Sequence, residues 1–508
     1  MVTSGTAPAG TPIGVALADL ARRAPDAAAV TDPRRTVSRR ELEQRTNRLA
    51  RAYAARGGRE GDFVTIALPN GIEFVEAAIA TWKLGATPQP LSHRLPEREL
   101  RSIVDLVAPK LVVGLDADSG AAHVPAGFEP APELDDQPLP PAIAPSLKAP
   151  TSGGSTGTPK IIVSTEPAVA EGLTGLAALL RMSDSSVVLC TGPLSHNGPF
   201  LFSLAGLLLG VHVVVMDRFD AEQALELVQR HRVTWMYSVP TMLHRFVKLP
   251  APLRERFDLT TLRTVVTMAA PCAQWLKEAC VAWLGPDRLL ELYAATEAHA
   301  ATVIDGHGWL ARPGSVGRPV MGQISVRDSD GTELPSGGTG EIWMRRSTDL
   351  AAPYRYIGAR PRVSTDGWES VGDRGRLDAD GYLYLADRMT DMIIVGGSNV
   401  YPAEVEAVLE EHPDVHSACV IGLPDEEYGQ VPHAVVQTDS AAFDADALTS
   451  YLRSRIAPYK VPRSYEFTSE PLRDEAGKLR RALHTQRPSR VYRLGHSGVS
   501  GDRAAESS

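Results

Sequence analysis

The segment from Thr151 to Lys160, which reads TSGGSTGTPK, combines the residue types that a bound polyphosphate requires. Its glycines accept positive φ and bring backbone N–H groups close to phosphate oxygens, while its hydroxyls add donors and Lys160 adds a positive charge. The segment is therefore predicted to hold the phosphates of a nucleoside triphosphate. The residues expected to line this phosphate loop are Thr151, Ser152, Gly153, Gly154, Ser155, Thr156, Gly157 and Lys160.

The phosphate loop differs from the P-loop of the Walker type. That motif places its lysine after a glycine at the start of a helix, whereas Pro159 precedes Lys160 here and disfavours helix at Thr158. The alternative is a flexible Gly/Ser linker. Linkers seldom end in Pro-Lys before a β-branched run such as Ile161 to Val163, which is predicted to form a strand.

Length and composition indicate a multidomain enzyme that acts on small molecules. The 508 residues exceed what one hydrophobic core usually holds. The net charge of −9 and the lack of a dense Lys/Arg block argue against nucleic acid or an anionic membrane as a partner. The four cysteines have no C-x-x-C spacing, which favours free thiols over a disulfide or a zinc site.

Residues 1–30 lack the basic start and apolar core of a signal peptide, and the apolar stretch 200–216 is too short and interrupted for a membrane span. A cytoplasmic protein without membrane insertion is expected, as a monomer or a homodimer. Within 200–216 the pattern predicts a buried helix that leads into a strand over 211–216.

Helical patterns alternate with short β-branched runs through the first 300 residues, as in βαβ units. Helices are predicted over 39–56, 72–84 and 221–231, and strands over 63–68, 111–115, 186–190, 234–238 and 263–267. The Pro-rich stretch 116–149 is interpreted as a surface excursion. From Gly314 onward the sequence pattern changes to short predicted strands, such as 340–344 and 381–385, separated by Gly-Asp turns. This pattern predicts a β-rich subdomain. A small domain follows, with a helix over 402–412 and a strand over 417–421.

Further groups suited to nucleotide chemistry follow the phosphate loop in the sequence. The run ELYAATE ends at Glu297 and places an aromatic ring, a hydroxyl and a carboxylate at a strand end, where they can stack on a base, contact phosphate and hold Mg²⁺. Asp373 follows a glycine and can accept two ribose hydroxyls. Lys478 stands on a predicted glycine turn near the end of the chain. Each of these residues taken alone is also typical of an ordinary solvated surface.

Together these motifs resemble the adenylate-forming superfamily of acyl- and aryl-CoA synthetases, nonribosomal-peptide adenylation domains and luciferases. The resemblance covers roughly residues 15–485 and rests on five motifs in the family's order: the phosphate loop, Y-x-x-T-E, G-D, the D-R…G-G crossover, and the terminal G-K. The stretch from Pro193 to Pro199 and the crossover look most like bacterial fatty-acyl or bile-acid CoA ligases. The implied fold is α/β, with a large N-terminal domain of parallel and mixed βαβ sheets plus a β-rich subdomain, and a small mobile α+β C-terminal domain.

The resemblance also implies roles for individual residues. The phosphate loop would cradle the β- and γ-phosphates and the departing pyrophosphate, and Lys478 would bridge the incoming oxyanion and the α-phosphate, where charge develops. His196 would gate the passage between substrate pocket and thiol tunnel, or would simply be a satisfied polar residue beside the core. The remaining roles are Tyr293 on adenine, Thr296 on the α-phosphate, Glu297 on Mg²⁺, Asp373 and Arg388 on ribose, Ala269, Ala270 and Pro271 along the adenine and substrate pockets, and Gly396 and Gly397 along the pantetheine channel.

Two-step chemistry requires a domain that can move, because a lysine that guides adenylation must leave before a second nucleophile enters. The expected organisation is a large adenylation domain over 1–386, a hinge over 387–391, a small domain over 392–488 that carries Lys478, and a disordered tail over 489–508. At Thr390, where the hinge pivot falls, the family more often has Asp or Lys.

Other departures from the family lie around the acceptor rather than around ATP. Ala294 and Ala269 stand where glycine is usual, which narrows the space near the α-phosphate or the pocket floor. We therefore predict an ATP- and Mg²⁺-dependent, AMP-forming ligase that adenylates a small aryl or acyl carboxylate and transfers it to CoA. One alternative is a diazotase-type enzyme of secondary metabolism that adenylates nitrite for attack by an arylamine. Another is a non-catalytic nucleotide-binding scaffold.

Overall fold

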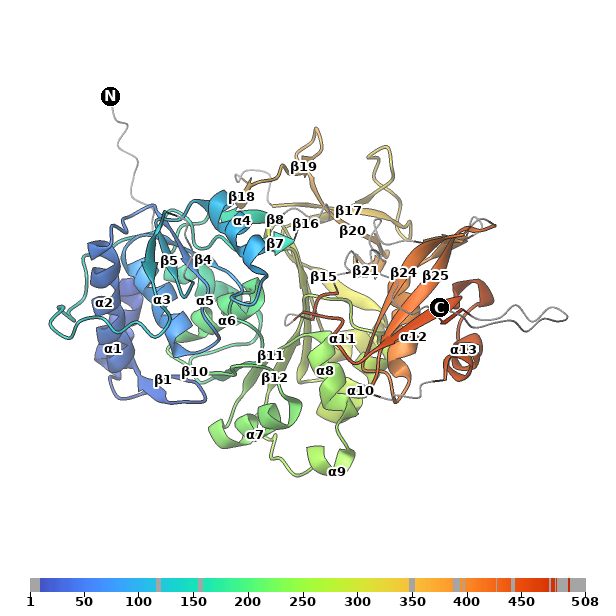
Figure 1. The fold of residues 1–508 in the computed structure, drawn as a ribbon, viewed down its shortest axis with the longest axis horizontal. Coiled ribbons are helices and arrows are strands. Elements are labelled where there is room, and N and C mark those ends of the chain that lie inside the picture. Colours follow the sequence, from blue (N-terminus) through green and yellow to red (C-terminus); the bar gives the residue numbers. More distant parts are fainter. Residues whose placement is uncertain are drawn as a thin grey trace, which may run out of the picture. The chain divides into compact units, whose positions relative to one another are not determined.

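The computed structural model describes residues 10–115, 120–153, 159–346, 352–386, 393–395, 398–425, 427–439, 444–474, 477–479, 481 and 492–493. The chain divides into two compact units (Figure 1). The large unit comprises Met1–Ala386 together with Glu475–Lys478, and the small unit comprises Asp387–Asp474 and Leu479–Ser508.

The main sheet of the large unit contains fourteen strands among the described residues, in a path that runs β16-β17-β20-β21-β15-β14-β13-β12-β11-β9-β10-β1-β2, with β19 paired to β20. Neighbours from β1 to β13 along this path pair in parallel, and the remaining neighbours pair antiparallel. The parallel strands are β1 (Ala28–Thr31), β9 (Val187–Cys190), β10 (His212–Val215), β11 (Trp235–Ser238), β12 (Thr264–Thr267) and β13 (Leu289–Ala294). The others are β2 (Thr36–Ser38), β14 (Ala301–Asp305), β15 (Ser315–Met321), β16 (Gln323–Arg327), β17 (Gly340–Arg345), β19 (Arg362–Val363), β20 (Glu369–Leu377) and β21 (Leu383–Ala386).

Two smaller sheets complete the strands of the large unit. A parallel sheet has the order β4-β3-β5-β6, and an antiparallel sheet has the order β18-β8-β7. Their strands are β3 (Phe63–Ile66), β4 (Thr87–Pro90), β5 (Leu111–Val113), β6 (Ala122–Val124), β7 (Thr151–Gly153), β8 (Pro159–Ser164) and β18 (Tyr354–Ile357). The β-rich subdomain predicted from residue 314 onward is thus not a separate sheet, because β14 and β15 join its strands to the parallel part.

The helices of the large unit begin where local sequence favours them. At the start of α2 the Ser38 hydroxyl accepts the Glu41 N–H while the Glu41 carboxylate accepts the Ser38 N–H, which is a capping box. The helices are α1 (Ile13–Arg23), α2 (Arg39–Ala55), α3 (Ile72–Lys83), α4 (Glu97–Val107), α5 (Ala170–Leu179), α6 (Asn197–Leu208), α7 (Ala221–His231), α8 (Pro240–Lys248), α9 (Ala251–Arg254), α10 (Gln274–Leu284) and α11 (Gly306–Ala311).

Helices α3 and α6 are buried on almost every side, in agreement with their apolar sequences. The Trp82 ring on α3 and the Phe200 ring on α6 meet edge to face with centroids 5.8 Å apart in the main core. The buried helix predicted from residue 200 begins earlier, at Asn197. The end of the predicted surface excursion 116–149 is also different, since Ala144, Lys148 and Ala149 are buried.

The small unit has its own sheet and core. Its strands follow the order β23-β22-β25-β26-β27, with β24 paired to β25, and its core centres on residues such as Val405 and Tyr465. The elements are β22 (Ile393–Val395), β23 (Ser398–Val400), α12 (Pro402–Glu411), β24 (Ser417–Asp425), β25 (Gly429–Gln437), α13 (Ala445–Arg453), a 3₁₀ turn (Pro458–Lys460), β26 (Ser464–Thr468) and β27 (Tyr492–Arg493).

Candidate active site

The two ends of the predicted phosphate loop lie on two paired strands, which are called the phosphate hairpin below. Strands β7 and β8 pair antiparallel, with Ser152 opposite Lys160 and Gly153 opposite Pro159. The five residues between them, Gly154, Ser155, Thr156, Gly157 and Thr158, lie outside the described residues, as does the side chain of Ser152. Lys160 is the second residue of β8 and so lies close in sequence to the loop. At the other end of the hairpin, the Thr151 hydroxyl accepts a hydrogen bond of 2.9 Å from the amide of buried Gln89.

Lys160 and Glu297, which are 137 residues apart in the sequence, meet at this hairpin. The Lys160 Nζ lies 3.2 Å from Glu297 Oε1, and Glu297 is 9% exposed. Glu297 belongs to the turn between β13 and β14, at the carboxyl end of a parallel strand, where open α/β sheets place their ligands. The structure therefore brings together the predicted phosphate lysine and the predicted metal-binding carboxylate.

A third residue, Tyr356 on β18, completes this cluster and was missed by the sequence analysis. Its hydroxyl accepts a hydrogen bond of 2.9 Å from Lys160 and donates a short one to Glu297 Oε1, and Lys160 Nζ lies 4.2 Å from the centre of its ring. Strand β18 reaches the site because it pairs with β8, with Tyr356 opposite Ile162. No motif around Tyr356 signals this contact in the sequence.

Electrostatics keep the Glu297 carboxylate ionised. Burial by itself raises the pKa of Glu297, but the Lys160 ammonium, the Tyr356 hydroxyl and the residue's own backbone N–H together hold that pKa below its ordinary value. Burial, and then the neighbouring Glu297 charge, raise the pKa of Tyr356 well above its usual range, so the phenol keeps the proton that it donates.

An ionised carboxylate beside a phosphate-loop lysine has the donor chemistry that Mg²⁺ requires. Magnesium in nucleotide sites is commonly held by one or two carboxylates together with substrate phosphates. Within the described ranges, no group of three or more His, Cys, Asp or Glu side chains is placed to hold a metal by itself. Glu297 thus fits a metal that arrives with a nucleotide rather than one held in an all-protein cage.

The residues predicted for the nucleoside also meet. The Tyr293 hydroxyl donates a 2.8 Å hydrogen bond to Asp373 Oδ2, which joins the end of β13 to β20. Both side chains are partly exposed. Thr296 lies one residue before Glu297 in the same turn and is likewise partly exposed, so the aromatic ring, the hydroxyl and both carboxylates belong to adjacent segments.

Ala269, Ala270 and Pro271 follow the carboxyl end of β12, the strand beside β13. Ala269 has a φ of 75°, and Ala298, next to Glu297, has a φ of 60°. Alanine in this left-handed region costs about 1–2 kcal/mol, and such strain clusters at functional sites. The chain therefore keeps the backbone shape that glycine usually provides while adding a methyl group at Ala269.

His196 is the N-cap residue of α6, and the half-buried side chain of Asn70 fixes the loop before it. The Asn70 amide donates to the carbonyls of Gly192 and Met216 at 2.9 and 3.0 Å and accepts the Leu194 N–H at 2.8 Å. Asn197, the residue after His196, accepts a hydrogen bond from the ammonium of buried Lys148.

Lys148 is a buried cation near the site that the sequence analysis did not single out. It is 6% exposed, and burial lowers the pKa of Lys148 to about 8, against the opposing effect of the Glu297 charge. Lys148 lies three residues before the start of β7, inside the stretch 116–149 that the sequence predicts to be a surface excursion, and the effect of the Glu297 charge on it shows that it is near the site.

Lys478 is exposed on a tight turn, and Gly477 before it has a φ of 75°. A backbone bridge pairs Arg473 with Leu479 across this turn. The lysine on a glycine turn predicted from the sequence is therefore present. Arg388, the hinge 387–391, Gly396 and Gly397 lie outside the described residues. Of the predicted disordered tail 489–508, the structure describes Tyr492 and Arg493, whose backbone forms β27 and pairs with β26.

The phosphate hairpin with Lys160, a carboxylate suited to Mg²⁺, a Tyr–Asp pair that joins the end of β13 to β20, and a second, smaller unit are together typical of an adenylate-forming enzyme. Two family models match the chain: AMP-binding enzyme over residues 17–354, and AMP-binding enzyme C-terminal domain over residues 404–478. The chain therefore belongs to the AMP-binding enzyme family.

Curated relatives and solved structures agree with this family. The chain is 33% identical to a feruloyl-CoA synthase from an Amycolatopsis species, over 90% of this chain and 95% of the relative. It is also 33% identical to the 2-succinylbenzoate–CoA ligase of Geobacillus kaustophilus, over 90% and 94%. Its fold matches o-succinylbenzoate CoA synthetase from Bacillus subtilis in complex with the acyl-adenylate intermediate, with a TM-score of 0.82, 26% identity and coverage of 96% and 100%. The α/β fold with a large N-terminal and a smaller C-terminal domain is thus confirmed.

None of the helices in the described part of the chain has both the length and the apolar character needed to cross a bilayer.

Proposed function

We propose that this protein is an AMP-forming acid–thiol ligase that adenylates a small aryl or acyl carboxylate with ATP and transfers the acyl group to CoA. The observation that carries the proposal is the buried Glu297 carboxylate held against Lys160 at the phosphate hairpin. The relatives named above, which use feruloyl and 2-succinylbenzoyl groups, support an acid with an aromatic ring.

In the adenylation step, the protein positions the substrates and neutralises the charge on the phosphates, as in other transfers at phosphorus. The residues from Thr151 to Lys160 bind the β- and γ-phosphates and retain the leaving pyrophosphate. Glu297 would hold Mg²⁺, which supplies charge neutralisation between the phosphates when bound. Thr296 contacts the α-phosphate, and Tyr293, Asp373 and Arg388 bind the nucleoside.

Lys478 donates hydrogen bonds to the substrate carboxylate and the α-phosphate as charge develops during in-line attack. In the thiol step, the small domain 392–488 turns about the hinge 387–391 and withdraws Lys478. His196 then borders the path of the thiol, and Gly396 and Gly397 allow the pantetheine chain to approach closely. The nitrite alternative finds no support among the relatives named above.

The test is a panel of carboxylic acids assayed by pyrophosphate release with ATP and Mg²⁺. Aromatic acids such as cinnamates and benzoates are expected to stimulate release, and addition of CoA is expected to convert the adenylate to an acyl-CoA that mass spectrometry detects. Stimulation by nitrite with an arylamine, but by no carboxylic acid, would overturn the proposal.

Replacement of Lys478 tests the adenylation role separately. In Lys478→Ala we expect ATP–pyrophosphate exchange to fall about 100-fold or more, because an oxyanion-stabilising donor is lost, while ATP binding stays within about threefold. Lys110→Ala is the matched control, since Lys110 is an exposed lysine of the large unit. Unchanged exchange in Lys478→Ala would exclude the catalytic role of Lys478.

A further inference from the structure

The hydroxyl of Tyr356 forms hydrogen bonds with both Lys160 and Glu297, the two residues proposed to bind the nucleotide and its metal. Tyr356 accepts the Lys160 N–H at 2.9 Å and donates to Glu297 Oε1, while its ring lies under the Lys160 ammonium at 4.2 Å. Lys160 comes from the phosphate hairpin and Glu297 from the turn after β13. Tyr356 thus joins two elements whose side chains must act on the same phosphates.

The strand that carries Tyr356 is itself anchored to the turn that carries Glu297. Tyr354, two residues earlier on β18, packs edge-on against the Tyr356 ring with centroids 4.6 Å apart. Its hydroxyl donates at 2.5 Å to Glu369 on β20, and Glu369 also pairs with His299 at 2.9 Å. His299 lies two residues after Glu297, so β18 holds both ends of this short segment.

The Lys160–Glu297 ion pair has to change when a nucleotide binds. Lys160 is expected to turn its ammonium toward a phosphate and Glu297 its carboxylate toward a metal, and each then loses the other as a partner. A side chain that bonds to both can keep them in place through that exchange. A hydrogen bond to a charged group contributes about 1.5–3 kcal/mol, which corresponds to roughly 10- to 100-fold in an equilibrium constant.

We propose that Tyr356 is a positioning residue that couples metal binding at Glu297 to nucleotide binding at Lys160. This inference rests on the proposed function, in which Glu297 and Lys160 serve ATP and its metal. Tyr356 contacts neither the metal nor the reacting atoms, and acts through the two side chains that do.

Tyr356→Phe tests the proposal because it removes the hydroxyl and keeps the ring under Lys160. The measurement is binding of ATP by calorimetry, with Mg²⁺ and with EDTA, which needs no turnover. In the wild type, Mg²⁺ is expected to strengthen ATP binding. In Tyr356→Phe, the ratio of ATP affinity with Mg²⁺ to ATP affinity in EDTA is expected to be about tenfold smaller than in the wild type. The ATP affinity in EDTA should stay within about threefold of the wild-type value.

Tyr354→Phe is the matched control on the same strand. It also removes one hydrogen-bonded phenol hydroxyl, but that hydroxyl donates to Glu369 rather than to Glu297. We expect Tyr354→Phe to retain the wild-type effect of Mg²⁺ within about twofold, even where its melting temperature falls as far as that of Tyr356→Phe.

Equal effects of Mg²⁺ in Tyr356→Phe and the wild type would overturn the proposal. Equal losses in both variants would also overturn it, because the two tyrosines would then serve packing alone. An absence of any Mg²⁺ effect in the wild type would remove the metal from Glu297 and overturn it as well. Failure of the acid panel with an intact Mg²⁺ effect would instead contradict the proposed ligase activity and leave the coupling role supported.

Discussion

Two buried carboxylates of the large unit, Glu76 and Glu297, are both contacted by cations and yet ionise differently. Glu76 on α3 is fully buried, with Arg45 Nε at 2.6 Å and Arg35 at 3.6 Å, and burial raises its pKa to about 6 despite both arginines. Glu297 has one lysine at 3.2 Å, and its pKa is lowered.

Hydrogen-bond donors explain the difference. Glu297 receives bonds from Lys160, Tyr356 and its own backbone. Glu76 Oε1 is buried and has no hydrogen-bond partner within the described residues. The hydrogen bond from Arg45 and the charge of Arg35 do not offset the burial of Glu76, whereas the donors around Glu297 do offset its burial. Glu297 is thus kept charged, as the proposed binding of a cation requires.

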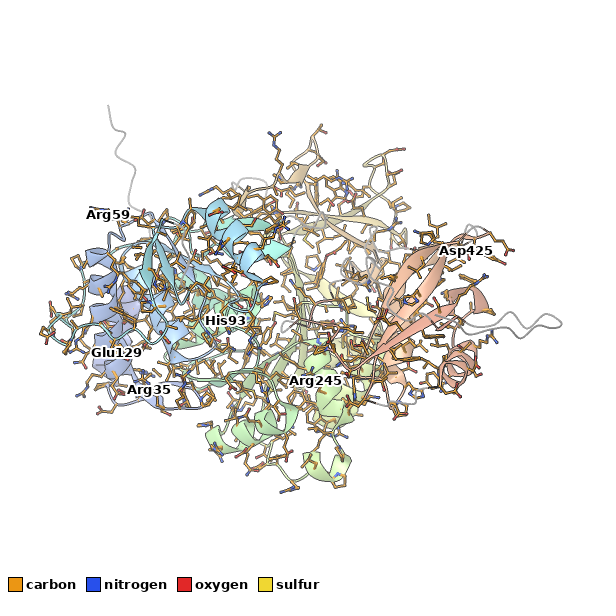
Figure 2. The ribbon with its side chains drawn as sticks, viewed as in Figure 1. Arg35, Arg59, His93, Glu129, Arg245 and Asp425 are labelled. Carbon is orange, nitrogen blue, oxygen red and sulfur yellow. The ribbon has the colours of Figure 1, made fainter. Side chains whose placement is uncertain are left out.

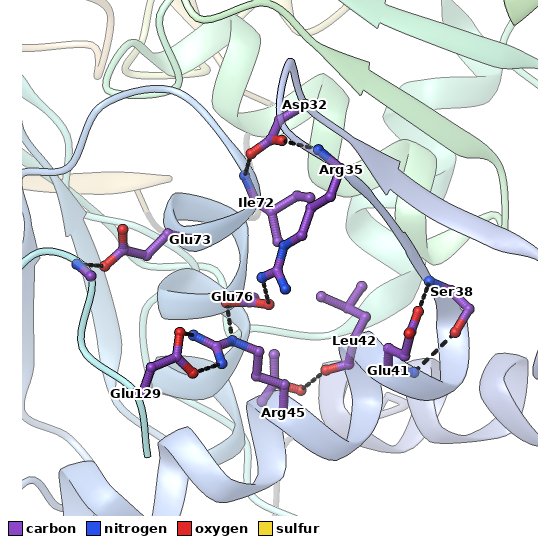
Figure 3. Close-up of polar contacts among 12 residues, drawn as sticks. Asp32, Arg35, Ser38, Glu41, Leu42, Arg45, Ile72, Glu73, Glu76 and Glu129 are labelled. Atoms are coloured by element: carbon purple, nitrogen blue, oxygen red, sulfur yellow. Dashed lines mark hydrogen bonds and ion pairs between the residues drawn. The ribbon is translucent and has the colours of Figure 1, made fainter.

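The Glu76 network also differs in what it connects. Figure 3 shows Arg45 bridging Glu76 on α3 and Glu129 on the neighbouring loop, while Arg35 approaches Glu76 from the other side. Figure 2 labels Arg35 and Glu129 and locates this network in the large unit. All its partners belong to the protein, so the network contributes to stability. In the Lys160–Glu297 cluster, both partners are proposed to pass to a ligand.

Removal of Arg45 is expected to have the largest effect among the tests of the difference between Glu76 and Glu297. Arg45→Met leaves Glu76 buried without its nearest cation, and we expect a loss of about 3 kcal/mol in the free energy of unfolding, measured by urea denaturation. Adding Glu76→Gln to Arg45→Met should restore much of this loss. Glu129→Gln, which removes only the exposed partner of Arg45, should cost about 1 kcal/mol or less. Equal losses from Arg45→Met and Glu129→Gln would contradict a role for burial.

Lys160→Met should have the opposite profile, with a large effect on activity and a small one on stability. We expect pyrophosphate exchange to fall about 100-fold, equivalent to about 2.7 kcal/mol of transition-state stabilisation, because a charge on the phosphates is lost. The free energy of unfolding should change by about 1 kcal/mol or less. A loss of stability as large as that of Arg45→Met would mean that the Lys160–Glu297 pair is structural.

The pH dependence of stability gives the smallest expected effect. The pKa of Glu76 is raised to about 6 from an ordinary value of 4.5, so the folded state binds this proton more tightly than the unfolded state. The resulting stabilisation is fully present below pH 4.5 and is lost as pH rises through 6, and its size is about 2 kcal/mol. Glu76→Gln should flatten that part of the profile between pH 4.5 and 6.5. A profile identical to that of the wild type would contradict the raised pKa.

The local elements were the part of the fold that could be predicted most closely. The helices predicted over 39–56, 72–84 and 221–231 appear as α2, α3 and α7 within one residue at each end, because apolar periodicity and capping act over a few neighbouring positions. The predicted end of the surface excursion 116–149 was wrong, because Lys148 near that end is buried. A lysine in a Pro-rich stretch gives no local sign that the surrounding chain will cover it.

The amino-acid sequence by itself determined the family and the proposed site residues: the phosphate loop, Glu297, Asp373 and Lys478 were recognisable because their residue types suit a nucleotide and their order is that of the family. Only the tertiary structure decided which side chains support them. Tyr356 reaches Glu297 because β18 pairs with β8 almost 200 positions earlier in the chain. Such pairing depends on the packing of distant segments rather than on local sequence, so no pattern around Tyr356 could reveal its partners.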